Sequence, residues 1–138
     1  MKNRKARSFV GIMIVIALSA LLLRVAADKA IRLNCSQNEA NAQSTLKLIS
    51  TALENYAKNN RGVYPDKISV LTQSAPAYLD RDYVKQSPIK GYIYGCSRLG
   101  PGGYSCHALP SRCRLTGGTL FTVSTGSLLI AEDCEKKE

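Results

Sequence analysis

Five cysteines and a single histidine are the residues of this 138-residue chain with the most distinctive chemistry. Four of the cysteines share the last third of the sequence: Cys96, Cys106, Cys113 and Cys134. In a small domain on the far side of a membrane, four cysteines predict a disulfide framework with three possible connectivities. We favour pairing Cys96 with Cys106 and Cys113 with Cys134. Structural thiols or a zinc site are the alternative, although the sequence has no Cys-x-x-Cys motif.

The fifth cysteine, Cys35, stands apart on a predicted helix, either as a free thiol or as a link between neighbouring subunits. Cys106 and His107 are the candidate pair for nucleophilic catalysis, because a thiol needs a nearby base. Adjacent residues of a strand point to opposite faces, so this pair is poorly placed for proton transfer. No second histidine is present to act as the base of a serine triad. The sequence therefore predicts no enzymatic activity and no small-molecule substrate.

Charged residues suggest two kinds of ligand, and we weigh both against solvated surface. Glu132 and Asp133 are the candidate metal ligands, because calcium prefers carboxylate oxygens, but adjacent acids near a chain end are more often solvated. We expect no cofactor, with calcium as the alternative. The net charge of +9 raises nucleic-acid binding as a possibility, with the trio Arg98, Arg112 and Arg114 as its best candidates. Because aromatic residues do not alternate with these bases, we do not expect nucleic acid as a partner.

These residues must be positioned by a long N-terminal helix. Residues 9–27 are almost uncharged and, as a helix of about 1.5 Å rise per residue, cover about 28 Å, close to a bilayer's hydrocarbon thickness of roughly 30 Å. Its apolar membrane-facing positions are Phe9, Ile12, Ile14, Ile16, Leu18, Leu21 and Leu22. The basic residues of the leader, 1–8, predict a cytoplasmic N-terminus, a single span of the inner (cytoplasmic) membrane and an extracytoplasmic head. Removal of the span as a secretory signal is the alternative.

Beyond residue 27 the apolar run narrows to a stripe that repeats every three or four residues, which is typical of a helix buried on one side. We expect this stripe to form the core between helix and sheet: Ala42, Leu46, Ile49, Leu53 and Tyr56. Glu54 is expected to face away from it. Several asparagines around Cys35 weaken helix propensity, so a local bend is expected there. The helix should end near Gly62, and Asp66 should cap a short helix that follows.

The last third of the chain has the sequence pattern of short β-strands. Strands are predicted at residues 89–95, 104–109, 119–124 and 127–131, and Thr125-Gly126 is the strongest hairpin signal. The fold class is therefore α+β: a long N-terminal helix, membrane-spanning in its first half, packs its C-terminal half on an antiparallel sheet of three or four strands. The expected parts are a leader (1–8), a transmembrane segment (9–27), an amphipathic segment (28–61) and a disulfide-bonded head (62–138).

This order of elements resembles the type IV pilins and the pseudopilins of type II secretion. The most specific match covers residues 38–47 and 52–56 and the break Gly62-Val63-Tyr64-Pro65, and it is similar to the major pseudopilin type. The resemblance implies a pilin-like fold and a subunit that waits in the inner membrane. It also implies assembly into a periplasmic or surface filament with copies of itself or related pilins, by secretion or pilus assembly machinery.

The leader motif of that family has a Gly, then the first mature residue Phe, then a Glu five residues into the mature chain. Ser8 and Phe9 hold the matching positions, a possible site of leader processing, but Ser8 replaces the Gly, and no carboxylate follows at Gly11, Ile12 or Met13.

Two functions follow from the resemblance. The first is a structural filament subunit that assembles through its apolar helix. The alternative is a membrane-anchored extracytoplasmic binding module that does not polymerise and binds through tyrosines, namely Tyr78, Tyr83, Tyr92, Tyr94 and Tyr104.

Overall fold

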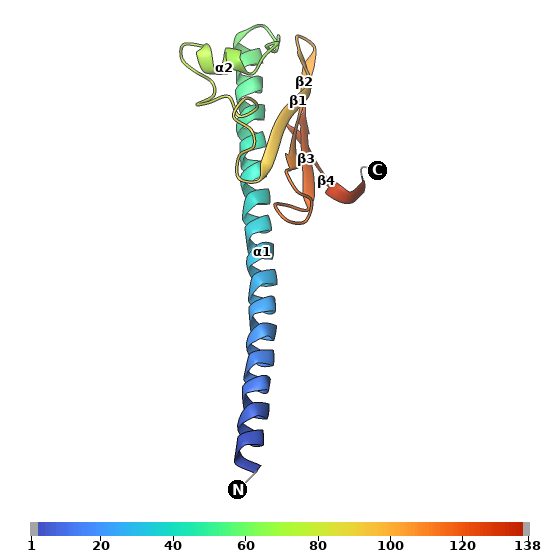
Figure 1. Cartoon of the computed structure of the whole chain (residues 1–138). Coiled ribbons are helices and arrows are strands. Elements are labelled where there is room, and N and C mark those ends of the chain that lie inside the picture. The colour runs from blue at the N-terminus through green and yellow to red at the C-terminus, as the bar shows by residue number, and fades with distance from the viewer. Residues whose placement is uncertain (1–2, 137–138) are drawn as a thin grey trace. The chain divides into compact units, whose positions relative to one another are not determined.

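The computed structural model describes the backbone of residues 3–136 and the side chains of residues 8–135. The chain is α+β, which confirms the predicted fold class. Two helices are followed by four strands and a short 3-10 helix: α1 (Asn3–Asn59), α2 (Ser69–Gln73), β1 (Tyr92–Gly100), β2 (Gly103–Pro110), β3 (Thr119–Ser124), β4 (Leu128–Asp133) and η1 (Cys134–Lys136). Figure 1 shows these elements along the chain. Of the predicted basic leader, residues 1–8, the side chains of residues 1–7 lie outside the described part.

The chain divides into two compact units, Met1–Leu33 and Asn34–Glu138, which we treat separately. In the first unit α1 carries its apolar side chains on all sides, and Phe9 and Leu23 are 64% and 71% exposed. The predicted loosening around Cys35 is wrong, because α1 is helical throughout Asn3–Asn59. Asn38 and Asn41 of that stretch bond to Thr116 and Lys90 of the head, so their low helix propensity is offset by tertiary contacts.

The head unit contains an antiparallel meander with the strand order β1-β2-β3-β4, so each strand pairs only with its neighbour in sequence. The register is regular from β2 to β4, whereas β1 has a bulge between Cys96 and Arg98. One face of the sheet packs on the head half of α1 (Figure 1).

The core lies between that face of the sheet and α1. Ala42, Leu46, Ile49 and Leu53 of the predicted stripe are buried, each at most 1% exposed. They meet side chains that alternate along the strands: Tyr92, Tyr94, Tyr104, Cys106, Ala108, Phe121 and Val123. Tyr56 is only partly buried, because it lies past the sheet and makes an edge contact with Tyr78, with ring centroids 5.6 Å apart.

The ends of the elements follow local backbone chemistry. After α1 the chain turns through Arg61 and Gly62, both at positive φ (59° and 82°), and the Gly62 N–H bonds to the Ala57 carbonyl at 2.7 Å. The predicted capping role of Asp66 is wrong: α2 starts at Ser69, with Ile68 at its N-cap and no side-chain cap. The loop between β3 and β4 is the predicted hairpin, with Gly126 at φ 84°.

Candidate assembly surfaces

The largest candidate surface is the apolar segment of α1 in the first unit, exposed on all sides of the helix, which we call the apolar helix surface. Its large apolar residues are all more than half exposed: Phe9, Val10, Ile12, Met13, Ile14, Val15, Ile16, Leu18, Leu21, Leu22, Leu23 and Val25. Residues 9–27 include a single charged residue, Arg24. This helix is long and apolar enough to cross a membrane. Removing each large side chain from water is worth about 1.5–3 kcal/mol, so the surface favours lipid or other helices.

In the head, α1 holds the tip of the β3–β4 hairpin through a set of polar contacts, which we call the hairpin clamp. Glu54 Oε1 accepts hydrogen bonds from the Tyr104 hydroxyl at 2.9 Å and from the Gly126 N–H at 2.8 Å. Its other oxygen accepts from the Tyr64 hydroxyl at 3.0 Å. The buried Ser50 hydroxyl lies 3.0 Å from the Tyr104 hydroxyl and 2.6 Å from the Ser127 hydroxyl. The prediction that Glu54 faces away from the head is therefore wrong.

The tyrosines of this clamp are held in the neutral form. Burial raises the pKa of Tyr104, and the neighbouring Glu54 carboxylate adds to that rise. Burial likewise raises the pKa of Tyr64, again with help from Glu54. A neutral hydroxyl can donate to a carboxylate and a phenolate cannot, so the raised pKa values keep both donors in place.

A second set of contacts joins α1 to the loop before β3, and we call it the loop clamp. The Glu39 carboxylate accepts from the Gly118 N–H at 2.8 Å and from the Thr119 hydroxyl at 3.3 Å. Asn38 donates to the Thr116 carbonyl at 2.9 Å. Cys35, a free thiol, donates to the Leu115 carbonyl at 3.2 Å. The two clamps bracket the apolar core, so polar bonds fix where the sheet sits along this part of α1.

Close packing beside the loop clamp demands a glycine. A Cβ at Gly117 would come within 2.1 Å of the Tyr92 hydroxyl. That hydroxyl donates to the Thr119 carbonyl at 2.8 Å, so the loop can approach the sheet only without a side chain at Gly117.

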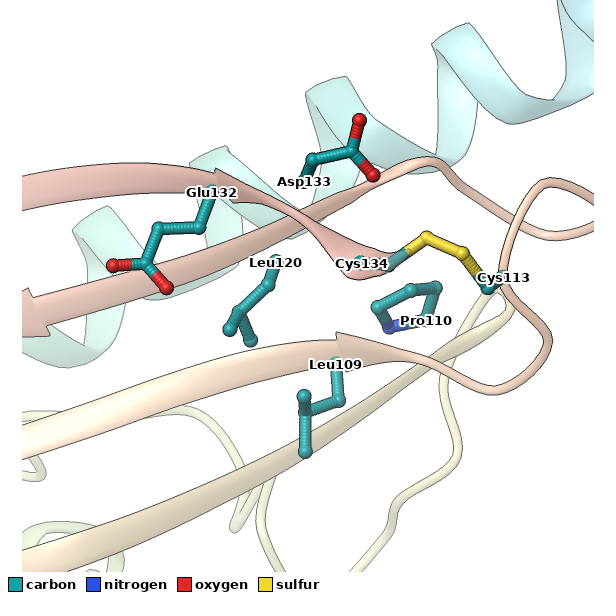
Figure 2. Close-up of a pocket in the computed structure, with 7 residues that line it drawn as sticks. All are labelled: Leu109, Pro110, Cys113, Leu120, Glu132, Asp133 and Cys134. Carbon is teal, nitrogen blue, oxygen red and sulfur yellow. A yellow bond between two sulfur atoms is a disulfide. The ribbon is translucent and has the colours of Figure 1, made fainter. Parts of the chain in front are cut away.

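The head contains two disulfides, Cys96–Cys106 and Cys113–Cys134, which is the pairing that we favour from the sequence. The first joins β1 to β2 across the sheet, and the second ties the C-terminal end of β4 to the loop after β2. Beside the second lies a cavity of about 130 Å³ (Figure 2), lined by Leu109, Pro110, Cys113, Leu120, Glu132, Asp133 and Cys134. In Figure 2 the carboxylates of Glu132 and Asp133 point away from each other.

The candidate metal and catalytic residues do not converge. Within the described residues, no group of three or more His, Cys, Asp or Glu side chains is placed to hold a metal ion, so Glu132 and Asp133 lack further ligands. Cys106 is bonded to Cys96, so its sulfur is not available as a nucleophile for His107 to activate. The His107 ring instead lies against Gly95 on β1, where a Cβ would come within 2.9 Å of the ring.

The remaining candidates are dispersed. Arg114 forms an ion pair with Glu135, while Arg98 and Arg112 are exposed. Of the tyrosines suggested for a binding surface, Tyr83, Tyr92, Tyr94 and Tyr104 are buried, and only Tyr78 is partly exposed. These tyrosines therefore form core rather than a recognition surface.

Sequence reasoning missed the residues of both clamps because polar residues on a helix are usually solvated. One signal was available: Ser50 and Glu54 follow Leu46 at intervals of four, so they lie on the same side of α1 as the buried stripe.

Comparisons of the chain with protein-family models, with curated proteins and with solved structures gave no significant match in any of the three.

Proposed function

We propose that this protein is a structural subunit of a filament of the pilus or pseudopilus type, anchored in the inner membrane before assembly. One observation carries the proposal: the large apolar side chains of residues 9–25, which cover about five turns of α1, are each more than half exposed within the described part of the chain. Lipid covers that surface in a single subunit, and neighbouring helices cover it in a filament. Both environments exclude water from the same side chains.

The head supports the same proposal by its chemistry. Two disulfides in a head of this size suit an oxidising compartment such as the periplasm. The head has a buried core of its own, bracketed by the two clamps. Residues 9–23 carry no charge, and assembly would therefore depend on van der Waals packing of apolar helices rather than on an ion pair inside the membrane.

The test is mechanical shearing of cells that express the full-length chain, followed by sedimentation and electron microscopy of the released material. We expect rods that contain the protein and that pellet at high speed. The membrane fraction is extracted in parallel with carbonate, which releases peripheral proteins but leaves spanning ones. A chain that stays in the membrane as a monomer and releases no rods would contradict the filament and leave an anchored module. Intact mass of the protein decides whether residues 1–8 are removed.

A further inference from the structure

The two edge strands of the sheet, β1 and β4, differ in how many of their outward backbone groups are hydrogen-bonded. In an antiparallel sheet the N–H and C=O of one residue point to the same neighbour, alternating along the strand. The Thr125 N–H bonds to the Tyr104 carbonyl at 3.1 Å, so odd-numbered residues of β3 bond to β2 and even-numbered ones to β4. The Cys134 N–H bond to the Gly118 carbonyl, at 3.0 Å, continues that even series. The odd-numbered residues of β4 therefore direct their backbone groups away from the sheet.

Those residues are Leu129, Ala131 and Asp133, and within the described chain no backbone hydrogen bond from another element reaches them. β4 has no Pro, no Lys and no bulge, and its two charged residues, Glu132 and Asp133, lie together at its C-terminal end. The residues on either side of Leu129 in this strand, Leu128 and Ile130, are 59% and 46% exposed. A bare, partly apolar edge of this kind is a template for pairing with another strand.

The other edge, β1, is closed along its first half. Ile89 exchanges two backbone bonds with Tyr92, at 2.8 and 3.0 Å. The Tyr94 N–H donates to the Ser87 hydroxyl at 2.8 Å. Beyond the bulge this cover ends. Leu99 pairs with Tyr104, whose own backbone bonds go to β3, so the backbone groups of Leu99 face outward.

A groove of about 560 Å³ runs beside this open half of β1. Its lining includes Ser97 and Leu99 of β1 together with Lys67 and Lys85. Asp66 and Asp82 also line the groove, and the Asp82 carboxylate accepts from the Lys85 N–H at 3.0 Å. The open half of β1 thus has room beside it for an added strand.

We propose that the bare edge of β4 pairs with the open half of β1 in a second copy of this chain. The inference rests on the proposed filament, in which copies share one orientation. β1 and β4 are the first and fourth strands of an antiparallel meander, so they run in opposite directions. Two copies in the same orientation therefore bring β4 of one and β1 of the next together antiparallel. Such a head-to-tail contact extends a filament wherever the rotation from one copy to the next does not close a ring.

Charge fixes the register. Placing Ala131 opposite Leu99 lets the outward groups of both residues bond to each other and puts Glu132 opposite Arg98. Glu132 pairs with Leu120 and Arg98 with Ser105, so both side chains lie on the face of the sheet away from α1. Both are exposed, and neither forms an ion pair with another described residue. Opposite charges directly across two strands stabilise the pair, and anchoring in one membrane raises the effective concentration of the partner.

The test is cross-linking in membranes that contain the full-length chain with Cys35→Ser, which removes the free thiol. Glu132→Cys and Arg98→Cys are made singly and together, and copper phenanthroline serves as the oxidant. We expect the double variant to give a ladder of dimers and larger multimers on non-reducing gels, and each single variant to stay monomeric. Dimers from Glu132→Cys alone would overturn the proposal, because two β4 edges would then meet. No ladder from the double variant would overturn it as well.

Charge reversal gives a second measurement that needs no new cysteine. Glu132→Arg and Arg98→Glu should each lower the yield of sheared filament several-fold, and the double variant should restore it. Failure of the double variant to restore that yield contradicts the pairing. Rods from the unmodified chain without a ladder from the double cysteine variant would leave the filament proposal intact and refute the strand pairing alone. Absence of both rods and ladder would count against both proposals.

Discussion

At the scale of single residues, Glu54 has the clearest structural role. Its carboxylate accepts hydrogen bonds from two tyrosine hydroxyls and from the N–H of Gly126, and these donors come from three separate parts of the head. A carboxylate is well suited to this position because it can accept several hydrogen bonds at once and donates none. One carboxylate of α1 thereby bonds to the sheet, to the hairpin tip and to the segment after α1.

Replacing Glu54 should destabilise the head. Glu54→Ala leaves the Tyr104 hydroxyl and the Gly126 N–H without this acceptor, which costs about 1–3 kcal/mol in free energy of unfolding. The measurement is denaturant unfolding of the full-length chain in detergent, followed by the near-ultraviolet signal of the tyrosines. Asn55→Ala, at the exposed neighbouring position, is the matched control and should be near neutral. Equal losses from the two variants would mean that the clamp contributes nothing specific.

The buried tyrosines predict how stability depends on alkaline pH. Burial raises the pKa of Tyr94 and of Tyr104 above the usual tyrosine value of about 10. The unfolded chain therefore loses these protons first, so the free energy of unfolding is unaffected by them below pH of about 10 and falls as the pH rises further. Tyr94→Phe should reduce the slope of that fall. An unchanged slope in Tyr94→Phe would contradict this assignment.

At the scale of elements, the head half of α1 acts as the support on which the sheet is built. Leu46 is completely buried at its centre, whereas Leu48, half a turn away, is 53% exposed. Leu46→Ala should lower the free energy of unfolding by about 2–5 kcal/mol through lost burial and a cavity. Leu48→Ala, the same chemical change on the other side of the helix, should cost no more than about 0.5 kcal/mol. Both are measured on the detergent-solubilised full-length chain, where a large loss in Leu48→Ala would contradict the orientation of α1.

The sequence was informative where one physical signal dominates. The spacing of Ala42, Leu46, Ile49 and Leu53 predicts the buried side of α1, and the strand pattern around Gly126 predicts the hairpin. The capping role of Asp66 could not be decided from sequence, because an acid before a short apolar segment caps a helix only if the backbone turns at that residue. The extension of β1 to Gly100 was missed as well, since its pairing is set by β2 rather than by its own residues.

The same reason explains the missed part of the candidate surfaces. Asn38, Glu39 and Glu54 are polar residues on a helix, and their own sequence neighbours do not reveal that residues 72 to 79 positions further on will bond to them. Edge protection is likewise a property of pairing. That β4 is bare while β1 is half covered follows only from the observed register and from the contacts of residues 87–89.

At the scale of the whole molecule, the two units differ in where their apolar side chains lie. The apolar helix surface is exposed and apolar enough to cross a membrane, whereas the head has a buried core of its own. Stability measurements on the head and insertion measurements on the first unit should therefore respond to different substitutions.

A charge placed in the apolar helix surface should weaken membrane insertion without unfolding the head. Leu18→Arg puts a cation in the middle of the predicted span, where insertion is disfavoured by about 2.5–3.5 kcal/mol. We expect a larger share of this variant to be released from membranes by carbonate, while the tyrosine signal of the folded head is kept. Gln37→Arg, at an exposed position in the second unit, is the control and should leave extraction unchanged. Full retention of Leu18→Arg in the carbonate pellet would argue against a span at this position.

The meander order of the strands also bears on how the head reaches its native state. β1 and β2, and likewise β3 and β4, meet across short turns, so forming these two hairpins closes small loops and loses little chain entropy. The bonds from the clamps to the sheet and to the loop before β3, by contrast, join residues 50 to 80 positions apart. We therefore expect the hairpins to nucleate early and their docking on the helix to be the slow, cooperative event of folding.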